Sequence, residues 1–141
     1  MEEFSENEID QLVAEAKKAR KNAYAPYSNF HVGAALLLKN SSIIHGNNVE
    51  NSSYGLSICA ERVAIAAAIA QGHHEFALMA VVTDTSPPAA PCGACRQVMS
   101  EFAPDLPLIL ANTDGQVIKT TLSAIFPLQF SKEQLNHRLK E

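Results

Sequence analysis

The chain has 141 residues, of which 47% are hydrophobic and 18% are charged, a size and composition that predict a single globular domain over residues 1–141. Its formal net charge of −4 weighs against a nucleic-acid partner, and no segment approaches the ~18 consecutive apolar residues that a membrane span needs. The cysteine count of three is odd, which favours metal binding over disulfide pairing in a reducing compartment.

The N-terminal segment predicts a helix with one apolar face. Ser5 and Glu8 have the spacing of a capping box, and the helix should end before Pro26. The apolar residues that recur at helical intervals are Ile9, Leu12, Val13, Ala16 and Ala23. Residues 1–4 are acidic and lack the basic and apolar regions of a secretory signal, so we expect a cytoplasmic protein.

A β-hairpin and a second helix are predicted next. Residues 30–38 form a β-branched and apolar run typical of a strand, residues 39–42 a polar turn, and residues 43–47 the partner strand. The alanine-rich segment 59–71 predicts a helix that stops at Gly72, and its small side chains allow close packing on a sheet. This second helix therefore begins at the first cysteine of the chain.

The second half of the chain alternates strands and helices. The predicted elements are a strand over 76–83, a loop over 84–91, a helix over 96–102, strands over 108–110 and 116–120 joined by a turn at 112–115, and a terminal helix that starts at a capping box in 131–134. Strands separated by helices usually cross over in parallel. The order of elements therefore predicts a three-layer α/β fold, in which helices flank a mixed five-stranded sheet.

The three cysteines lie in two short motifs. Cys59 belongs to a Cys-x-Glu motif, and Cys92 and Cys95 belong to a Pro-Cys-x-x-Cys motif. Both motifs open predicted helices, where the helix dipole and free N–H groups favour thiolates that bind metal. Three protein ligands leave a fourth position for water, which is typical of a catalytic zinc site rather than a structural one. We therefore expect these three cysteines to bind one Zn²⁺ per subunit.

Two charged residues follow Cys59 in the sequence. Glu61 stands in a run of alanine and isoleucine, where an ionised carboxylate is costly unless it has a function. We expect neighbouring thiolates and apolar walls to raise its pKa, which suits a group that transfers protons at the metal. Arg62 would offset part of the charge of three thiolates, with an ordinary ion pair as the alternative interpretation.

A histidine could instead close the metal site as its fourth ligand. His73 and His74 stand at the far end of the helix that Cys59 begins, about 21 Å away at 1.5 Å per residue, and are too distant. His31 and His45 lie on the predicted hairpin, where distance does not exclude them.

Four segments of the chain resemble the cytidine deaminase family, specifically its short, homotetrameric branch. They are Ala25-Pro26-Tyr27-Ser28-Asn29-Phe30-His31-Val32-Gly33-Ala34-Ala35, Gly46-Asn47-Asn48-Val49-Glu50-Asn51-Ser52-Ser53-Tyr54, Cys59-Ala60-Glu61-Arg62 and Pro91-Cys92-Gly93-Ala94-Cys95-Arg96-Gln97. Zinc-dependent deaminases combine such cysteine motifs with a glutamate that is not a ligand. The resemblance extends from the first predicted helix to near the C-terminus.

The resemblance implies a hydrolase that converts cytidine and 2′-deoxycytidine to uridine and 2′-deoxyuridine with release of ammonia, in pyrimidine salvage. Glu61 would be the catalytic proton shuttle. Asn48 and Glu50 would hold the ribose hydroxyls, and Phe30 would pack on the nucleoside. The backbone of Ala60 would read the pyrimidine edge together with Glu61. Without the cysteine motifs, Asn48 reads as a turn former, Glu50 as a solvated charge and Phe30 as core.

The resemblance also implies a homotetramer whose active sites are shared, with Tyr54 and Phe130 reaching a neighbouring subunit. The sequence departs from the family here, because residues 126–130 read Phe-Pro-Leu-Gln-Phe where the family usually has Leu-Pro-Gly-Ala-Phe. Leu128 thus stands where the family usually has a glycine, a residue whose backbone adopts conformations that other residues avoid. We expect the altered Leu128-Gln129 loop to carry Phe130 differently.

Two other functions compete with cytidine deamination. One is a deaminase of the same fold that acts on another aminopyrimidine, such as a blasticidin-like nucleoside or a base within RNA, although the negative net charge weighs against a polynucleotide. The other is a non-catalytic interaction module stabilised by zinc, with a histidine as the fourth ligand.

Overall fold

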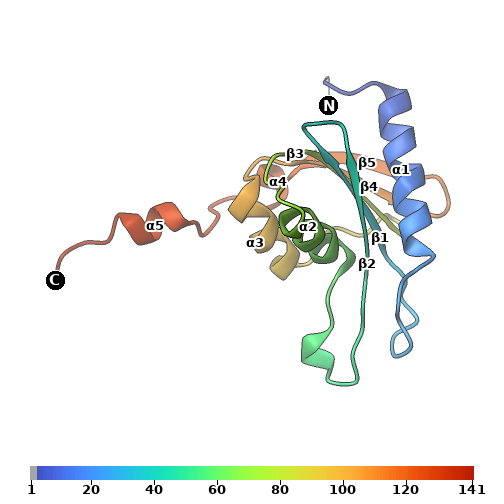
Figure 1. Ribbon diagram of the computed structural model, residues 1–141, viewed down its shortest axis with the longest axis horizontal. Helices are drawn as coiled ribbons and strands as arrows, with labels where there is room; N and C mark the ends of the chain where they lie inside the picture. Colours follow the sequence, from blue (N-terminus) through green and yellow to red (C-terminus); the bar gives the residue numbers. More distant parts are fainter. Residues whose placement is uncertain (1–2) are drawn as a thin grey trace.

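A five-stranded sheet forms the centre of the molecule (Figure 1) in the computed structural model, which describes residues 3–141. Its strands are β1 (Gly33–Leu38), β2 (Ile43–Asn47), β3 (Phe76–Thr83), β4 (Pro107–Asn112) and β5 (Val117–Thr121). They lie in the order β2-β1-β3-β4-β5, with β3 and β4 parallel and the other neighbouring pairs antiparallel. The predicted mixed five-stranded sheet is confirmed.

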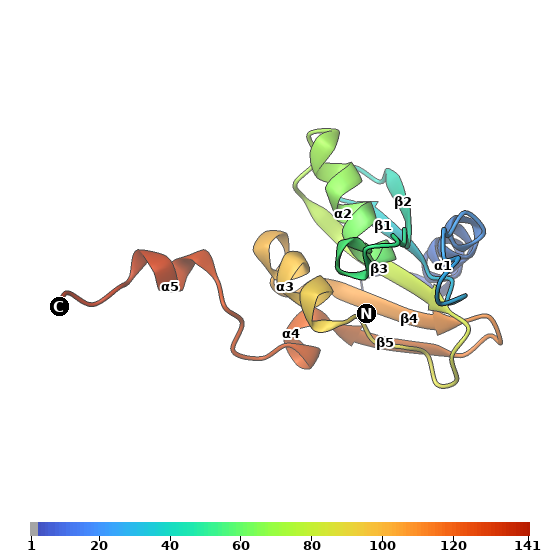
Figure 2. The same cartoon turned by 90° about the horizontal axis from the view of Figure 1, so that it is seen from below.

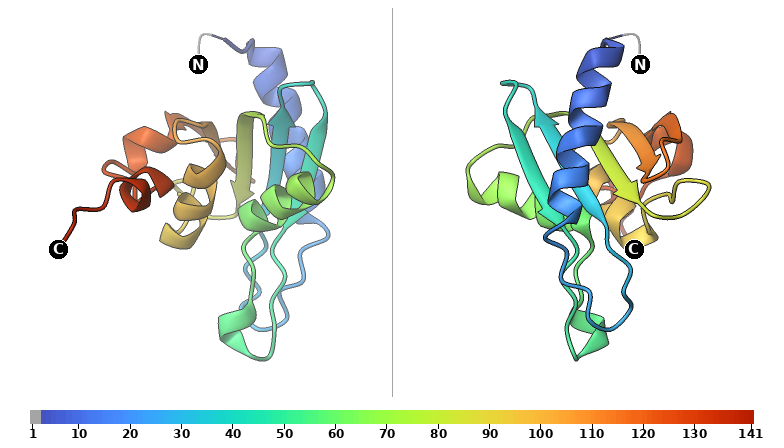
Figure 3. Two further views of the ribbon diagram at one scale, coloured as in Figure 1. Left: turned by 60° about the vertical axis from the view of Figure 1, so that its left-hand side comes forward. Right: turned by 90° about the vertical axis from the view of Figure 1, so that its right-hand side faces the viewer.

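Helices cover both faces of this sheet, as Figures 2 and 3 show. The helix α1 (Glu6–Arg20) packs on one face, while α2 (Ala60–Ala70) and α3 (Gly93–Phe102) pack on the other. Each face has its own buried apolar cluster, because side chains alternate between the two faces along each strand. The predicted three-layer α/β fold is therefore confirmed. Residues 3–141 also contain three shorter helices: η1 (Tyr54–Leu56), α4 (Leu122–Ile125) and α5 (Lys132–Asn136).

Two glycines let helices approach the sheet closely. A Cβ atom at Gly33 of β1 would lie 2.0 Å from the carbonyl oxygen of Ala16 in α1. A Cβ atom at Gly46 of β2 would lie 2.4 Å from the carbonyl oxygen of Ala60 at the start of α2. Only glycine fits at such separations, so Gly46 sets the depth at which the first turn of α2 rests on the sheet.

Several predicted helix ends are confirmed by hydrogen bonds and backbone angles. The capping box holds at Ser5, which exchanges bonds of 3.1 Å with Glu8. Gly72 follows α2 with φ of +85°, a left-handed conformation that suits glycine. Gln134 accepts the backbone N–H of Ser131 at 3.1 Å and so caps α5.

Two predicted boundaries are wrong. The first strand begins at Gly33 rather than at position 30, because most backbone groups of residues 30–32 that form hydrogen bonds do so with polar side chains rather than with a neighbouring strand. α1 ends at Arg20, so Ala23 lies beyond it and Ala19 supplies the last buried position of the helix. Elsewhere the differences are one to three residues at element ends, and η1 and α4 were not predicted.

Two loops extend together beyond one end of the sheet (Figures 1 and 3), comprising residues 24–32 and 48–58. A bridge between Tyr24 and Val49 joins them, and the Tyr24 N–H donates to the Asn48 carbonyl oxygen at 2.9 Å. The C-terminal arm (residues 126–141) projects sideways from the sheet, in a different direction from these loops (Figures 1 and 2). No helix within residues 3–141 is long and apolar enough to cross a membrane. Residues 1 and 2 of the acidic start lie outside the described residues.

Candidate metal centre and active site

The three cysteine side chains meet between the N-termini of α2 and α3. Cys59 is the N-cap of α2, Cys92 is the N-cap of α3, and Cys95 lies in the first turn of α3. The Sγ atoms of Cys59 and Cys92 are 3.8 Å apart, and those of Cys92 and Cys95 are 3.4 Å apart. All three sulfurs lie within 4.8 Å of one another. Two helices thus bring together residues that are 33 positions apart in the chain.

This cluster fits a zinc ion. With Zn–S bonds of about 2.3 Å in a tetrahedral site, ligand sulfurs lie roughly 3.8 Å apart, close to the distances found. Thiolates are ligands that zinc prefers. Within residues 3–141 these cysteines are the only group of three or more potential ligands, so no histidine belongs to the cluster. His45 instead lies 3.6 Å from the carboxylate of Glu15 on α1.

The sulfurs differ in acidity. Hydrogen bonding to Cys95, with a further contribution from Arg62, lowers the pKa of the Cys59 thiol to about 5. The same interaction with Cys59, together with burial, raises the pKa of the Cys95 thiol. The low pKa at Cys59 favours the thiolate form, which is the form that binds metal.

Arg62 directs its guanidinium back at the sulfur cluster from the first turn of α2. Its Nη2 donates to the Sγ atom of Cys59 at 3.6 Å. The Nε atom is buried and has no hydrogen-bond partner in the part of the chain that the structure describes. No carboxylate in residues 3–141 forms an ion pair with Arg62, so the thiolate rather than a carboxylate is its charge partner. A cation at this place stabilises negative charge on the cluster.

Glu61 lies in the first turn of α2 with only 5% of its surface exposed. Burial raises the pKa of this carboxyl to about 7, and the charge of Cys59 adds to the effect. The raised pKa that the sequence predicts is confirmed. A carboxyl with a pKa near neutrality both accepts and donates protons readily, as general acid–base catalysis requires.

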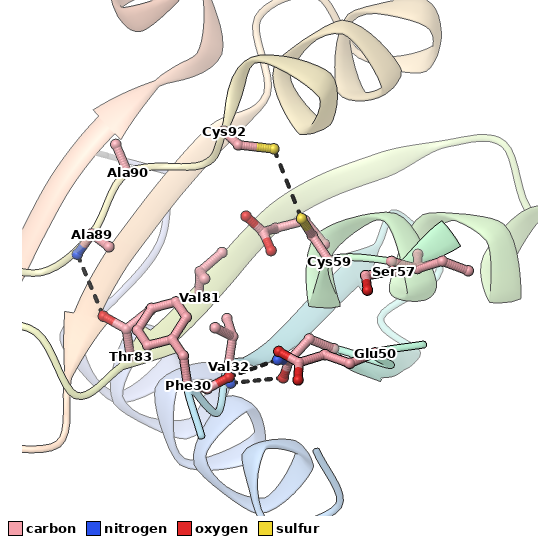
Figure 4. Close-up of a pocket in the computed structure, with 13 residues that line it drawn as sticks. Phe30, Val32, Glu50, Ser57, Cys59, Val81, Thr83, Ala89, Ala90 and Cys92 are labelled. Carbon is pink, nitrogen blue, oxygen red and sulfur yellow. Dashed lines mark hydrogen bonds between the residues drawn. The ribbon is translucent and has the colours of Figure 1, made fainter. Parts of the chain in front are cut away.

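A cavity of about 250 Å³ opens beside the sulfur cluster (Figure 4). Its walls come from the two projecting loops, from β3 with the loop that follows, and from the starts of α2 and α3. The lining residues include Phe30, Asn48, Glu50, Cys59, Glu61 and Cys92, all of which the sequence singled out, together with Val32, Ser57, Ile58, Val81, Thr83, Ala89 and Ala90. The cavity is concave, largely apolar and has few polar groups, as small-molecule sites usually are.

Asn48 is buried and holds one loop of the cavity in place. Its Oδ1 accepts the backbone N–H of Val32 at 2.9 Å, and its Nδ2 donates to the carbonyl oxygen of Phe30 at 2.7 Å. An amide has two acceptor sites and two N–H groups, so one of each remains for a ligand. Asn48 therefore fixes Phe30 and still faces the cavity.

Glu50 organises the adjoining turn. Its Oε1 accepts the N–H groups of Tyr27 and Ser28 at 3.0 and 3.1 Å, and its Oε2 accepts the Ser28 hydroxyl. These bonds, that of the hydroxyl first, hold the pKa of Glu50 below its usual range. A carboxylate has about four acceptor sites, so Glu50 retains one for a ligand. The alternative interpretation of Glu50 as a simple solvated charge does not account for these bonds.

Comparison with known proteins decides the family. Residues 6–109 match the family model described as the cytidine and deoxycytidylate deaminase zinc-binding region. The chain belongs to the cytidine deaminase family. It is 47% identical over 135 residues to a cytidine deaminase of Sporosarcina psychrophila, covering 95% of this chain and 99% of that protein. A cytidine deaminase of Halalkalibacterium halodurans is 49% identical over 126 residues, which cover 89% and 96% of the two chains.

The solved structure of cytidine deaminase from Burkholderia pseudomallei has the same fold. It superimposes with a TM-score of 0.85 at 49% sequence identity, covering 90% of this chain and 100% of that chain. Membership in this zinc-binding family and the cluster of three cysteines together identify zinc as the cofactor of this cytidine deaminase family member, one ion per subunit.

Three of the residues predicted to bind substrate lie outside the cavity lining. Tyr54 in η1 is 72% exposed and contacts Tyr27, and Phe130 is half exposed in the C-terminal arm. Both are too exposed to be core residues of this subunit. The side chain of Ala60 is fully buried, and its backbone N–H belongs to the first turn of α2, where N–H groups lack helical partners.

Sequence reasoning missed several polar residues at this site, among them Ser57 in the cavity lining, Ser28 and Thr83. Ser28 donates to Glu50 and accepts the backbone N–H of Phe30 at 3.0 Å. Thr83 is buried at the end of β3, where its hydroxyl bonds to Thr85 and accepts the N–H of Ala89. A polar residue that closes an otherwise apolar strand was the available signal for Thr83. The bond from Ser28 joins residues 22 positions apart and has no local signal.

Proposed function

We propose that this protein hydrolyses cytidine and 2′-deoxycytidine to uridine and 2′-deoxyuridine with release of ammonia, and serves pyrimidine salvage. The observation that carries the proposal is the buried carboxyl of Glu61 beside three converging cysteine sulfurs at one end of a nucleoside-sized cavity. Family membership supports the reaction class. We further propose that residues 1–141 act as one domain in the cytoplasm.

The chemistry divides between the metal and Glu61. When bound by Cys59, Cys92 and Cys95, zinc supplies Lewis acidity, which makes water a nucleophile near neutral pH. The Glu61 carboxylate accepts a proton from the attacking water and delivers one to the ring nitrogen N3, and a second transfer protonates the departing amine. A pKa of about 7 suits each of these transfers. Arg62 offsets the negative charge of the thiolates.

The remaining cavity residues bind and orient the nucleoside. Asn48 and Glu50 each keep a free hydrogen-bonding site, and amide and carboxylate groups suit ribose hydroxyls. Phe30, held at its N–H by Ser28 and at its carbonyl by Asn48, packs on the nucleoside. The backbone of Ala60 and the carboxyl of Glu61 read the amide edge of the pyrimidine.

We propose a homotetramer in which subunits share active sites. The exposed rings of Tyr54 and Phe130 support this proposal, since large apolar groups at a loop tip and on a projecting arm are typical of interfaces. Each would reach the cavity of a neighbouring subunit. Leu128 stands where the family usually has glycine and has a φ of 54°, a left-handed conformation that glycine adopts without strain. We expect the altered loop to carry Phe130 differently.

An absorbance assay with cytidine, 2′-deoxycytidine, a blasticidin-like nucleoside and a cytosine-containing RNA tests the proposal on zinc-loaded protein. We expect turnover of the first two substrates. Turnover of one of the others alone would replace the substrate assignment, whereas no turnover of any would favour a non-catalytic module. X-ray absorption distinguishes that module directly, because it predicts three sulfurs with an imidazole rather than with a light oxygen ligand.

A further inference from the structure

Arg20, the last residue of α1, bonds to two segments that line the cavity. Its Nε–H donates to the carbonyl oxygen of His31 at 2.8 Å, and its Nη2 lies 3.6 Å from Oδ2 of Asp84. His31 belongs to the segment 30–32, whose Phe and Val side chains line the cavity. Asp84 opens the loop 84–91, whose two alanines at 89 and 90 form another part of the wall. One side chain outside the cavity thus connects two of its walls.

The backbone of Arg20 is itself held firmly. Gly33 of β1 packs so closely on the helix end that a Cβ atom there would lie 2.5 Å from the nitrogen and 2.7 Å from the Cβ of Arg20. The side chain of Arg20 is only 25% exposed. A guanidinium is a planar group with several donors in fixed directions, so it can hold a carbonyl and a carboxylate at a set separation.

The segment 30–32 depends mostly on side chains for its shape, because its backbone bond to Asn48, from the Asn48 N–H to the Val32 carbonyl oxygen, is long at 3.4 Å. Ser28 and Asn48 bind the backbone of Phe30, and Asn48 also binds the N–H of Val32. Within residues 3–141, Arg20 is the one side chain bonded to this segment that also reaches the loop 84–91.

We propose that Arg20 is a positioning residue that sets the spacing between Phe30 and the loop 84–91, and thereby the fit of the cavity around a pyrimidine nucleoside. Arg20 touches no substrate and acts through these two segments. The inference rests on the proposed function, since it concerns the same cavity. Packing of Phe30 on the nucleoside contributes equally to the ground state and the transition state, so its loss affects binding rather than the chemical step.

Arg20→Ala should therefore raise KM for cytidine roughly tenfold, the loss expected for one hydrogen bond to a charged group, with kcat within about twofold of the wild type. Zinc content should stay at one per subunit, because the cysteine cluster lies on other elements. Arg20→Lys keeps the charge and loses the planar fork, so it should restore only part of the affinity. If Arg20 only stabilised the fold, the substitution would lower the melting temperature without raising KM selectively over kcat.

A double-mutant cycle tests the link between the two walls. Asp84→Asn should raise KM less than Arg20→Ala, and the double variant should be no worse than Arg20→Ala alone, since the two side chains form one connection. Lys18→Ala is the matched control on the same helix: Lys18 is 70% exposed, pairs with Glu15 at 3.0 Å and should leave KM unchanged.

Wild-type turnover of cytidine is measured first, so a failure of the proposed function shows itself in the wild type. Calorimetric titration with uridine then measures the fit of the cavity without turnover, and Arg20→Ala should weaken uridine binding by the same factor as it raises KM. An Arg20→Ala variant with wild-type KM and uridine affinity would overturn the inference. Additive effects of Arg20 and Asp84, or loss of zinc from the variant, would overturn it as well. A wild type that neither turns over cytidine nor binds uridine would overturn both proposals.

Discussion

Replacing Gly46 by alanine should displace the first turn of α2, which carries Cys59 and Glu61. The added Cβ would lie 2.4 Å from the carbonyl oxygen of Ala60 and 2.6 Å from the backbone nitrogen of Ala64. Carbon and oxygen atoms normally approach to about 3.3 Å, so the helix would have to move by roughly 1 Å. Both neighbouring atoms belong to the backbone, and no flexible side chain can give way instead.

This displacement has an energetic and a catalytic consequence. Overpacking a core costs about 1–3 kcal/mol, which lowers the melting temperature of a domain of this size by roughly 4–12 °C. A shift of about 1 Å at reacting groups can reduce the rate a hundredfold, so kcat/KM should fall by roughly 10- to 100-fold even well below the melting temperature.

The assay combines thermal unfolding with steady-state kinetics on cytidine. The kinetics are measured about 20 °C below the variant's melting temperature, a margin roughly two to five times the expected fall in melting temperature, so that the variant is folded during the assay. Gly55→Ala is the matched control, because a Cβ there meets no atom within 4 Å and the residue has no positive φ. It should melt like the wild type. A Gly46→Ala protein that is destabilised yet retains kcat/KM within twofold would show that the depth of α2 does not position the catalytic groups.

Three further outcomes are expected. Ser28→Ala removes the hydroxyl that holds the pKa of Glu50 down, so the pKa of Glu50 should rise. As the pH is lowered, KM for cytidine should therefore begin to increase at a higher pH in the variant than in the wild type. Coinciding pH profiles of KM for the two proteins would contradict this role of Ser28. Leu128→Gly should relieve left-handed backbone strain at a fully exposed position. After subtraction of the entropic cost of glycine, the local structure should be stabilised by about 0.5 kcal/mol, so amide exchange at residues 126–130 should slow about twofold. Unchanged or faster exchange would argue against strain at this position. Removal of zinc by a chelator should abolish deamination and lower the melting temperature, while the far-ultraviolet circular dichroism spectrum stays that of a folded protein, since the two apolar clusters draw most of their side chains from residues other than the cysteines. If added zinc restored neither the activity nor the melting temperature, that result would argue against the cysteine cluster as the zinc site.

Hydrophobic periodicity predicted the layers of this fold because its helices and strands bury continuous faces. The span of β3 matches its prediction of 76–83, since a fully apolar run bounded by turn residues leaves little freedom. The segment 30–32 was predicted as strand for the same reason. It is held instead by Ser28, Asn48 and Arg20, and side-chain bonds between distant residues have no period in the sequence.

The residues of the site also differ in how far the sequence alone predicts them. Cys59, Cys92, Cys95 and Glu61 stand in short motifs at helix starts, so each can be named from the local sequence, whereas the packing of α2 beside α3 brings the two motifs together. Placing the bonds of Glu50 required the three-dimensional structure, because its partners lie 22 and 23 positions away. The apolar wall that β3 and the following loop give the cavity consists of Val81, Ala89 and Ala90, which are small apolar residues that a sequence cannot distinguish from core residues.

The most direct test of the account compares cytidine turnover by zinc-loaded wild type and Glu61→Gln, with the zinc content of both measured. Glutamine keeps the shape of the side chain and cannot carry the proton. We predict that the variant retains one zinc per subunit and loses roughly 10²- to 10⁴-fold in kcat, the usual contribution of a proton-transferring side chain. A zinc-replete Glu61→Gln protein that deaminates cytidine within tenfold of the wild-type rate would contradict the central role assigned to Glu61.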